Sequence, residues 1–148
     1  MSQTNGRGIY LFVGAALLSL VGLAEAIYLT IEKLSGVLPT CGISNCGEVL
    51  NSPYAAIAGI PLAAFGAAAY FTVFSLATLA AFGSARARSL LFYVVAFMLA
   101  FSIWLFILQA FVIHAFCQYC LLSGAIVLIL SVLVTLDRFY FRRKYANA

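Results

Sequence analysis

Four long apolar stretches dominate the pattern of hydrophobic and polar positions along the chain. They occupy residues 9–31, 60–82, 89–113 and 119–139. Each stretch is long enough to cross a hydrocarbon core of about 30 Å, because an α-helix rises about 1.5 Å per residue. The pattern therefore predicts an all-α membrane protein that forms a four-transmembrane-helix bundle.

The connections between these stretches are short, with one exception. Residues 85–88 are expected to form a basic turn, and residues 114–117 join the third and fourth stretches. Only residues 32–59 are numerous enough to form structure of their own. Within them Ser52 is a candidate N-cap, Pro53 suits a first helical position and Gly59 a helix stop. We therefore expect a cysteine-bearing outer loop with a short surface helix at about residues 53–58. The whole chain, residues 1–148, is expected to form a single transmembrane domain.

Composition and charge limit the class of protein. A chain with 66% hydrophobic and only 8% charged residues has too few charges for a soluble surface or for disorder, which excludes a cytosolic enzyme. The first apolar stretch is too long for a signal peptide and lacks an A-x-A cleavage pattern. Placing both termini and the basic turn on the cytoplasmic side leaves Lys33 as the single outer basic residue of the eight. All four cysteines then lie at the extracytoplasmic face, in an oxidising compartment.

The cysteines form two closely spaced pairs. Cys41 and Cys46 lie on the long outer loop, and Cys117 and Cys120 form a CxxC at the start of the fourth stretch. A helix N-terminus favours the thiolate form of a cysteine. Disulfides that close such short loops restrain the unfolded chain very little, which favours a redox role for these cysteines over a structural one. A tetrahedral zinc site in a membrane subunit, a mercury-type cysteine-relay metal transporter and a purely structural disulfide pair remain alternatives.

Four segments carry a resemblance to a known family. In order along the chain they are GLAEAIYLT at 22–30, CGEVLNSPY at 46–54, GIPLAAFG at 59–66 and FCQYCLLSG at 116–124. With a loop cysteine pair, a serine six residues after its second member and a late CxxC, the chain resembles the prokaryotic homologues of vitamin K epoxide reductase. Since it ends at Ala148, we expect no fused thioredoxin-like domain.

This resemblance implies a function for the cysteines. By position, Cys41 would receive electrons from a separate thioredoxin-like (DsbA-like) partner, and Cys46 would pass them to Cys117. Cys120 would face a membrane quinone of the ubiquinone or menaquinone type, and Ser52 would help hold the loop over the site. The resemblance thus implies a quinone-dependent thiol-disulfide oxidoreductase that drives disulfide bond formation and needs no metal.

Two positions differ from the animal enzymes of the family. Leu62 and Gly124 stand where those enzymes carry an asparagine and a tyrosine that hydrogen-bond vitamin K. The resemblance therefore implies a quinone, rather than an epoxide, as the electron acceptor.

Several other residues are candidates for the site, each with a simpler alternative. His114 and Glu25 are candidate proton donors; a histidine at a helix end is also common at the membrane interface, and Glu25 could reach interfacial water. Gln109 is explained by an interhelical hydrogen bond. Aromatic residues are candidates to line a quinone pocket, although bundle packing or interface anchoring is the commoner role of such residues. These aromatic residues are Phe65, Tyr70, Phe111, Phe116 and Tyr119.

Overall fold

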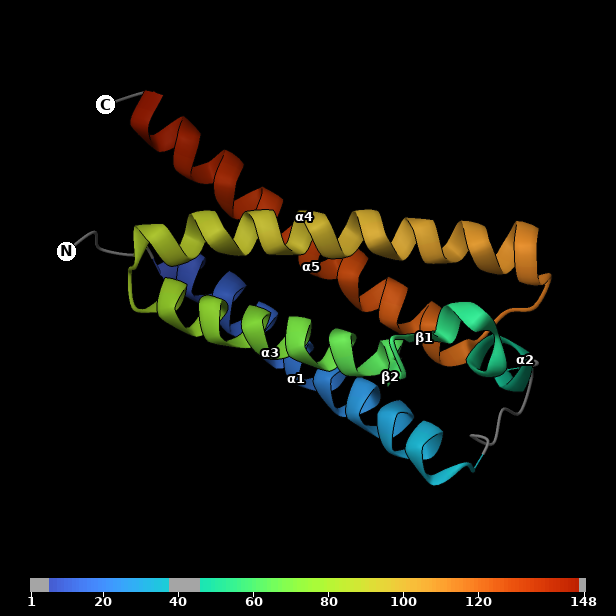
Figure 1. Cartoon of the computed structure of the whole chain (residues 1–148). Coiled ribbons are helices and arrows are strands. Elements are labelled where there is room, and N and C mark those ends of the chain that lie inside the picture. Colours follow the sequence, from blue (N-terminus) through green and yellow to red (C-terminus); the bar gives the residue numbers. More distant parts are fainter. Residues whose placement is uncertain (1–5, 38–45, 147–148) are drawn as a thin grey trace.

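The computed structural model describes residues 6–37 and 46–146, and four of the helices in that part of the chain are long and apolar enough to cross a membrane. They run lengthwise in one bundle (Figure 1). Their bounds are α1 (Gly6–Ser35), α3 (Leu62–Ala81), α4 (Ala85–Leu108) and α5 (Gln118–Ala146). The predicted four-helix bundle is confirmed, with helix positions close to those of the apolar stretches.

The connection between α3 and α4 differs from the prediction. Residues 85–88, expected as a turn, are the first turn of α4. The Ser84 hydroxyl oxygen accepts a hydrogen bond from the Ala87 N–H at 3.3 Å, and Gly83 has a positive φ of 94°. Because a serine N-cap starts α4 and a glycine in the left-handed region ends α3, the turn falls at residues 82–84 and the arginines become helical.

The long connection is also built differently from the prediction. Its regular helix is α2 (Cys46–Asn51), followed by a 3-10 turn, η1 (Pro53–Ala55), and a small antiparallel hairpin of β1 (Ala56–Ile57) and β2 (Ile60–Pro61). The expected helix at residues 53–58 is therefore wrong. The turn residues of the hairpin, Ala58 and Gly59, have φ values of 52° and 81°, as a two-residue hairpin turn requires.

Ser52 explains where α2 ends. Its hydroxyl donates to the Val49 carbonyl at 2.7 Å, and it makes no side-chain capping bond to the turn that follows. The predicted N-cap role of Ser52 is therefore wrong, since its side chain bonds backward to the preceding turn of α2 and not forward.

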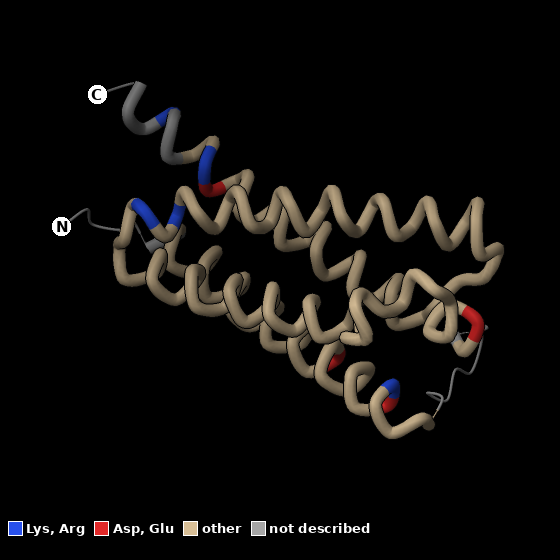
Figure 2. Tube along the Cα trace, viewed as in Figure 1, with Lys and Arg blue, Asp and Glu red and all other residues tan. Residues whose placement is uncertain are grey.

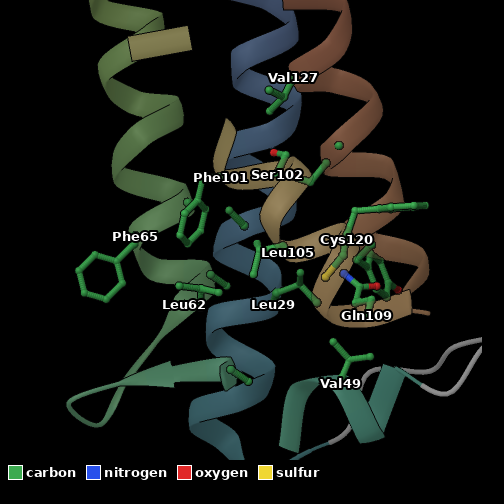
Figure 3. A pocket seen from close by; sticks show the side chains of 18 of the residues that line it. Leu29, Val49, Leu62, Phe65, Phe101, Ser102, Leu105, Gln109, Cys120 and Val127 are labelled. Carbon is green, nitrogen blue, oxygen red and sulfur yellow. The ribbon is translucent and has the colours of Figure 1, made fainter. Parts of the chain in front are cut away.

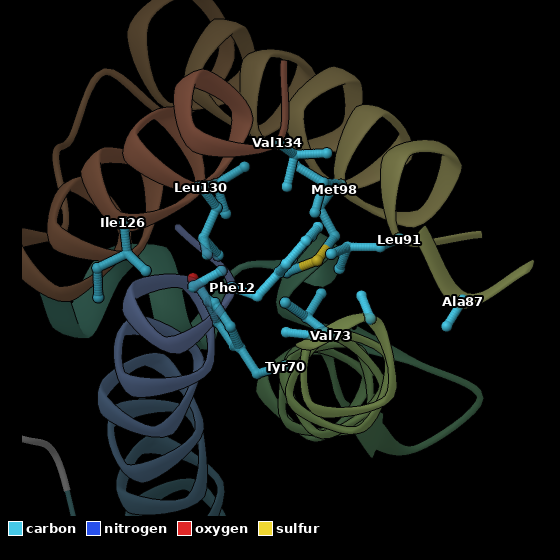
Figure 4. Packing of buried hydrophobic residues seen from close by; sticks show 14 of the residues in the cluster. Phe12, Tyr70, Val73, Ala87, Leu91, Met98, Ile126, Leu130 and Val134 are labelled. Atoms are coloured by element: carbon cyan, nitrogen blue, oxygen red, sulfur yellow. The ribbon is translucent and has the colours of Figure 1, made fainter. Parts of the chain in front are cut away.

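The core lies where all four long helices meet (Figure 4). It is formed by fully or almost fully buried side chains, among them Phe12, Val73, Leu91, Leu130 and Tyr70. Tyr70 crosses from α3 to α1 at Gly22, where a Cβ atom would lie only 2.4 Å from the tyrosine ring. The hydroxyl of Tyr70 then shares a hydrogen bond with the Ser123 hydroxyl on α5 at 2.7 Å. Three helices are thereby tied together through one side chain.

Charged residues gather at the two ends of the bundle (Figure 2). At the α3–α4 end, Arg88 pairs with Asp137 at 3.7 Å and lies 5.0 Å from the centre of the Phe12 ring. At the α2 end lie Glu48, in the first turn of α2, and Lys33, in the last turn of α1, which bonds to the α2 residue Leu50. The helix segments between the two ends are almost free of charge, as the core of a bilayer requires.

Candidate functional site

The CxxC pair opens α5, as the sequence predicted. Helix α4 passes into a π-helical turn, η2 (Gln109–Ile113), which ends at His114 in the left-handed region with φ 54°. The chain then reaches Cys117, whose carbonyl accepts the Leu121 N–H at 3.0 Å. This first helical bond of α5 puts Cys117 at the N-cap position and Cys120 in the first turn.

The hydrogen-bond donors around Cys117 favour its thiolate form. Both CxxC cysteines are free thiols in the structure, and the Cys117 side chain is completely buried. The Cys120 thiol donates a hydrogen bond to the Cys117 sulfur, and the backbone N–H groups of Tyr119 and Cys120 point at the same atom. Together these donors lower the pKa of Cys117 below that of an ordinary thiol, although burial acts in the opposite direction.

Cys120 lies in the wall of a cavity of about 650 Å³ in the half of the bundle next to α2. Figure 3 shows Leu29, Leu62, Leu105 and Val49 around this space, with the Cys120 sulfur at its edge. All four long helices contribute to the lining, which is mostly apolar. Such a cavity suits a flat, lipid-soluble ligand with a few polar atoms.

Glu25 is an ionisable group inside this apolar half. It belongs to α1 and lines the cavity, and both of its carboxyl oxygens are buried without a hydrogen-bond partner among the described residues. A buried polar group without a partner is costly and calls for an explanation. A ligand with a polar oxygen in the cavity would supply the missing bond.

Gln109 is a site residue that the sequence reasoning undervalued. Its side-chain oxygen accepts the backbone N–H of Cys117 at 3.0 Å, and the residue is only 4% exposed. The sequence interpretation assigned Gln109 an interhelical bond; the bond exists, but it goes to the first cysteine of the CxxC. A polar side chain eight residues before that cysteine, in an otherwise apolar stretch, was the available signal.

The other predicted pocket residues divide into two groups. Phe65, Tyr70 and Tyr119 line the cavity, and so do Leu62 and Gly124, which stand at the positions of the animal enzymes' polar residues. Phe111, Phe116 and His114 are exposed and do not contribute to the lining. Phe116 instead contacts Phe106, with ring centres 5.9 Å apart.

Helix α2 lies against the CxxC. Its Val49 is buried in a cluster with Ala115 and Cys117. Lys33, near the end of α1, donates from Nζ to the Leu50 carbonyl at 2.5 Å and lies 3.2 Å from the Asn51 side-chain oxygen. These contacts hold α2 close to the fully buried thiol.

The predicted loop residues are only partly covered by the structure. Ser52 lines the cavity, but its hydrogen bond stays within the loop. Cys46 is the first residue of α2. Cys41 and the side chain of Cys46 lie outside the described residues.

These features define a class: a four-span helical membrane protein that holds a CxxC pair between a surface helix and an apolar cavity. The family model of the vitamin K epoxide reductase family matches residues 14–135, and the chain belongs to this family. It is accordingly a multi-pass membrane protein.

A curated relative is the "Thiol-disulfide oxidoreductase LTO1" of Arabidopsis thaliana. The two are 33% identical over 110 residues, which is 68% of this chain and 29% of the relative. The chain thus spans less than a third of the length of that protein.

Proposed function

We propose that the protein is a membrane thiol-disulfide oxidoreductase that passes electrons from a thioredoxin-like protein to a membrane quinone and so drives disulfide formation. Electrons enter at Cys41 and Cys46 on the outer loop and leave through Cys117 and Cys120. The family membership and the name of the Arabidopsis relative support the thiol chemistry. The quinone and the partner are inferred from the site.

The observation that carries this proposal is the position of the CxxC between two different surroundings. Cys117 packs beneath Val49 of α2, on the side of the loop that bears Cys46. Cys120 borders the apolar cavity. A pair placed in this way is suited to take electrons from a loop cysteine on one side and to give them to a lipid-soluble acceptor on the other.

The residues of the cavity fit a quinone. Its ring needs apolar walls, which Leu29, Leu62 and Phe101 supply, and its oxygens need polar partners. The Glu25 carboxyl, unpartnered among the described residues, is one such partner. When bound, a quinone supplies an acceptor for the two electrons and two protons that are released when a dithiol becomes a disulfide.

The reaction at the cysteines follows the rules of thiol-disulfide exchange. A partner thiolate attacks the Cys41–Cys46 disulfide, and the freed Cys46 thiolate attacks the sulfur of Cys117 in the Cys117–Cys120 disulfide. The new Cys46–Cys117 bond forms as the Cys117–Cys120 bond breaks, and Cys120 leaves with the electron pair. The second thiol of the partner displaces Cys41 from the mixed disulfide that the first thiol formed, so the partner gains its own disulfide and Cys41 leaves as a thiolate. Cys41 then attacks Cys46 to restore the loop disulfide and releases Cys117, which leaves Cys117 and Cys120 reduced beside the cavity.

Two residues near the CxxC could transfer the protons of this reaction. The carboxyl of Glu25 can hold a proton at the cavity wall and give it up when negative charge develops there. Exposed His114 lies just before the CxxC, outside the lining, where exchange with water is possible.

We further propose that the α2 end of the bundle faces the extracytoplasmic side. Arg86 and Arg88 at the other end, in the first turns of α4, would then face the cytoplasm together with both termini, as the positive-inside rule requires. Labelling intact cells with a membrane-impermeant maleimide tests this arrangement. Labelling of Cys41 only after the membrane is made permeable would contradict it.

An anaerobic assay with purified protein tests the proposed function. Reduced thioredoxin-like protein and a soluble quinone are mixed with the membrane protein in lipid nanodiscs, and quinol formation is followed. Wild type is expected to form quinol, and Cys117→Ser and Cys120→Ser are expected to form none. Ser131→Ala, which loses only a hydrogen bond to the Val127 carbonyl of its own helix, serves as the matched control.

A second electron donor, dithiothreitol, tests the two cysteine pairs separately. Dithiothreitol is small enough to reduce Cys117–Cys120 directly, so Cys41→Ser should keep quinol formation with dithiothreitol and lose it with the thioredoxin-like protein. If wild type forms no quinol with either donor, the proposal is wrong. Stoichiometric zinc whose removal by a chelator unfolds the protein would favour the metal-site alternative instead.

A further inference from the structure

Gln109 is placed to act on both cysteines of the CxxC at once. Gln109 is the first residue of the π-helical turn at the end of α4. Such a backbone irregularity is frequent at functional sites. This turn carries the side chain toward the first turn of α5. Gln109 is 4% exposed and lines the cavity, so its amide is held away from solvent.

The orientation of the amide is fixed by one strong contact. The oxygen accepts the Cys117 N–H at 3.0 Å, one of the backbone donors that a helix N-terminus leaves without an internal partner. With the oxygen committed, the amide nitrogen must point the other way. In Figure 3 that nitrogen and the Cys120 sulfur lie toward one another, so the nitrogen is placed to donate to the sulfur.

We propose that Gln109 stabilises the Cys120 thiolate by donating its side-chain N–H to the sulfur, while its oxygen holds the CxxC backbone in place. The thiolate of Cys120 is the leaving group when Cys46 attacks Cys117, and exchange is faster when the leaving thiolate is more stable. Two electrons stay with the Cys120 sulfur in that step, and no other oxidant or reductant takes part. This role in electron transfer rests on the proposed function.

Other groups around Cys120 do not supply this donor. Besides Cys120, the titratable residues of the cavity wall are Glu25 and Lys33 from α1, Tyr70 from α3, Tyr54 from η1 and Tyr119 from α5. Cys117 packs against Tyr119 and Cys120 of this wall. The hydroxyl of Tyr70 is engaged with Ser123, and Lys33 is engaged with α2. Glu25 and the Cys117 thiolate would repel a second negative charge, whereas Gln109 offers a neutral N–H donor on the side of the sulfur.

Two substitutions separate the two halves of the amide. Gln109→Glu keeps an oxygen for the Cys117 N–H but removes the N–H donors, whereas Gln109→Leu removes both. Each is made in full-length Cys117→Ser protein, in which Cys120 is the remaining thiol of the pair and the backbone N–H at position 117 is retained. The rate of iodoacetamide labelling at Cys120 is measured from pH 6 to pH 10 by mass spectrometry of its peptide.

We expect both substitutions to slow the labelling of Cys120 at neutral pH by about tenfold, because the thiolate loses a hydrogen bond and hydrogen bonds to charged groups are stronger than those between neutral groups. Ser131→Ala, the matched control on α5, should leave the profile unchanged. A purely structural role predicts the opposite sign, because loosening the start of α5 would expose Cys120 and speed its labelling. Gln109→Glu also adds a carboxylate that repels a thiolate, so the uncharged Gln109→Leu decides: an unchanged or faster profile in folded Gln109→Leu overturns the proposal.

A measurement without substitution at Gln109 covers the case in which the variants do not fold. In the Cys117→Ser protein, the side-chain amide protons of Gln109 should shift in NMR spectra with the same midpoint pH as Cys120 labelling, and no shift would overturn the proposal. Neither measurement uses a quinone or a partner protein. If the Gln109 variants slow Cys120 labelling as expected but wild type forms no quinol, the proposed function alone is rejected. If wild type forms quinol but the Gln109 variants leave Cys120 labelling unchanged, the role of Gln109 alone is rejected.

Discussion

The half of the bundle near the α3–α4 turn is filled with side chains, whereas the half beneath α2 holds a cavity of about 650 Å³. The same four helices build both. In the filled half Leu91 and Leu130 have no exposed surface, and the buried Asp137 is paired with Arg88. In the open half the buried Glu25 has no partner among the described residues. The difference indicates that one half provides stability, whereas the other keeps space and a buried carboxyl without a described partner, as the proposed function would require.

The largest expected effect comes from shortening one leucine in each half. Leu130→Ala should lower the free energy of unfolding by about 2–5 kcal/mol, because it opens a new cavity in a packed region. Leu62→Ala, in the wall of the existing cavity, should lower it by less than about 1 kcal/mol, since little packing is lost. Equilibrium unfolding in detergent micelles measures both values. Equal losses at the two sites would remove the proposed division between the halves.

The second prediction concerns the boundary between the halves. Gly22→Ala should cost about 1–3 kcal/mol, because a Cβ atom at 2.4 Å forces the Tyr70 ring away from α1. The matched control is Gly14→Ala on the same helix, where the nearest atom would be an ordinary 3.9 Å away. That control should be neutral or slightly stabilising, since alanine favours a helix more than glycine does. Thermal unfolding of the two variants side by side is the measurement.

The third prediction concerns the pH dependence of Cys117. Because its pKa is lowered, chiefly by the hydrogen bond from the Cys120 thiol, its labelling should level off at a lower pH than that of an ordinary cysteine. Cys120→Ala removes that donor and should move the midpoint upward, with about tenfold slower labelling at neutral pH. Tyr119→Phe keeps the backbone N–H and should not move it. A midpoint that stays in place in Cys120→Ala would contradict the hydrogen-bond cause.

The smallest expected effect is at the contact between α1 and α2. Lys33→Met removes the donor to the Leu50 carbonyl and to the Asn51 side chain. We expect the ratio of partner-driven to dithiothreitol-driven quinol formation to fall by about threefold, as a net hydrogen-bond contribution of roughly 0.5–1.5 kcal/mol implies. A matched Lys33→Arg variant should restore most of the ratio. The same ratio in all three proteins would show that this contact does not position the loop.

Helix positions followed well from the sequence, and local turns did not. The four spans were predicted because apolar runs of this length have one stable form in a bilayer. The loop was mispredicted because Ser52 can bond backward to Val49 or forward to the next turn, and the chain uses the backward bond. Such choices depend on neighbours that a single segment does not reveal.

The candidate site, like the fold, could be predicted only in part from the sequence. The CxxC at the start of α5 was predictable from its spacing and from the apolar stretch after it. Which aromatic residues line the cavity was not, because Phe65 and Phe111 are chemically alike and only their places in α3 and in the π-helical turn decide which of them reaches the cavity. The contact of Gln109 with Cys117 required the π-helical turn and the left-handed His114, neither of which has a clear sequence signal.

The sequence by itself determined that the chain has four membrane spans, that its cysteines form two pairs and that one pair opens a helix, since these follow from length, apolarity and spacing. Only the tertiary structure decided what each sulfur contacts. Cys117 packs beneath α2 and Cys120 borders a cavity because of how four helices and one loop meet. Those contacts join residues far apart in the chain, and their energies depend on the packing of all the segments together.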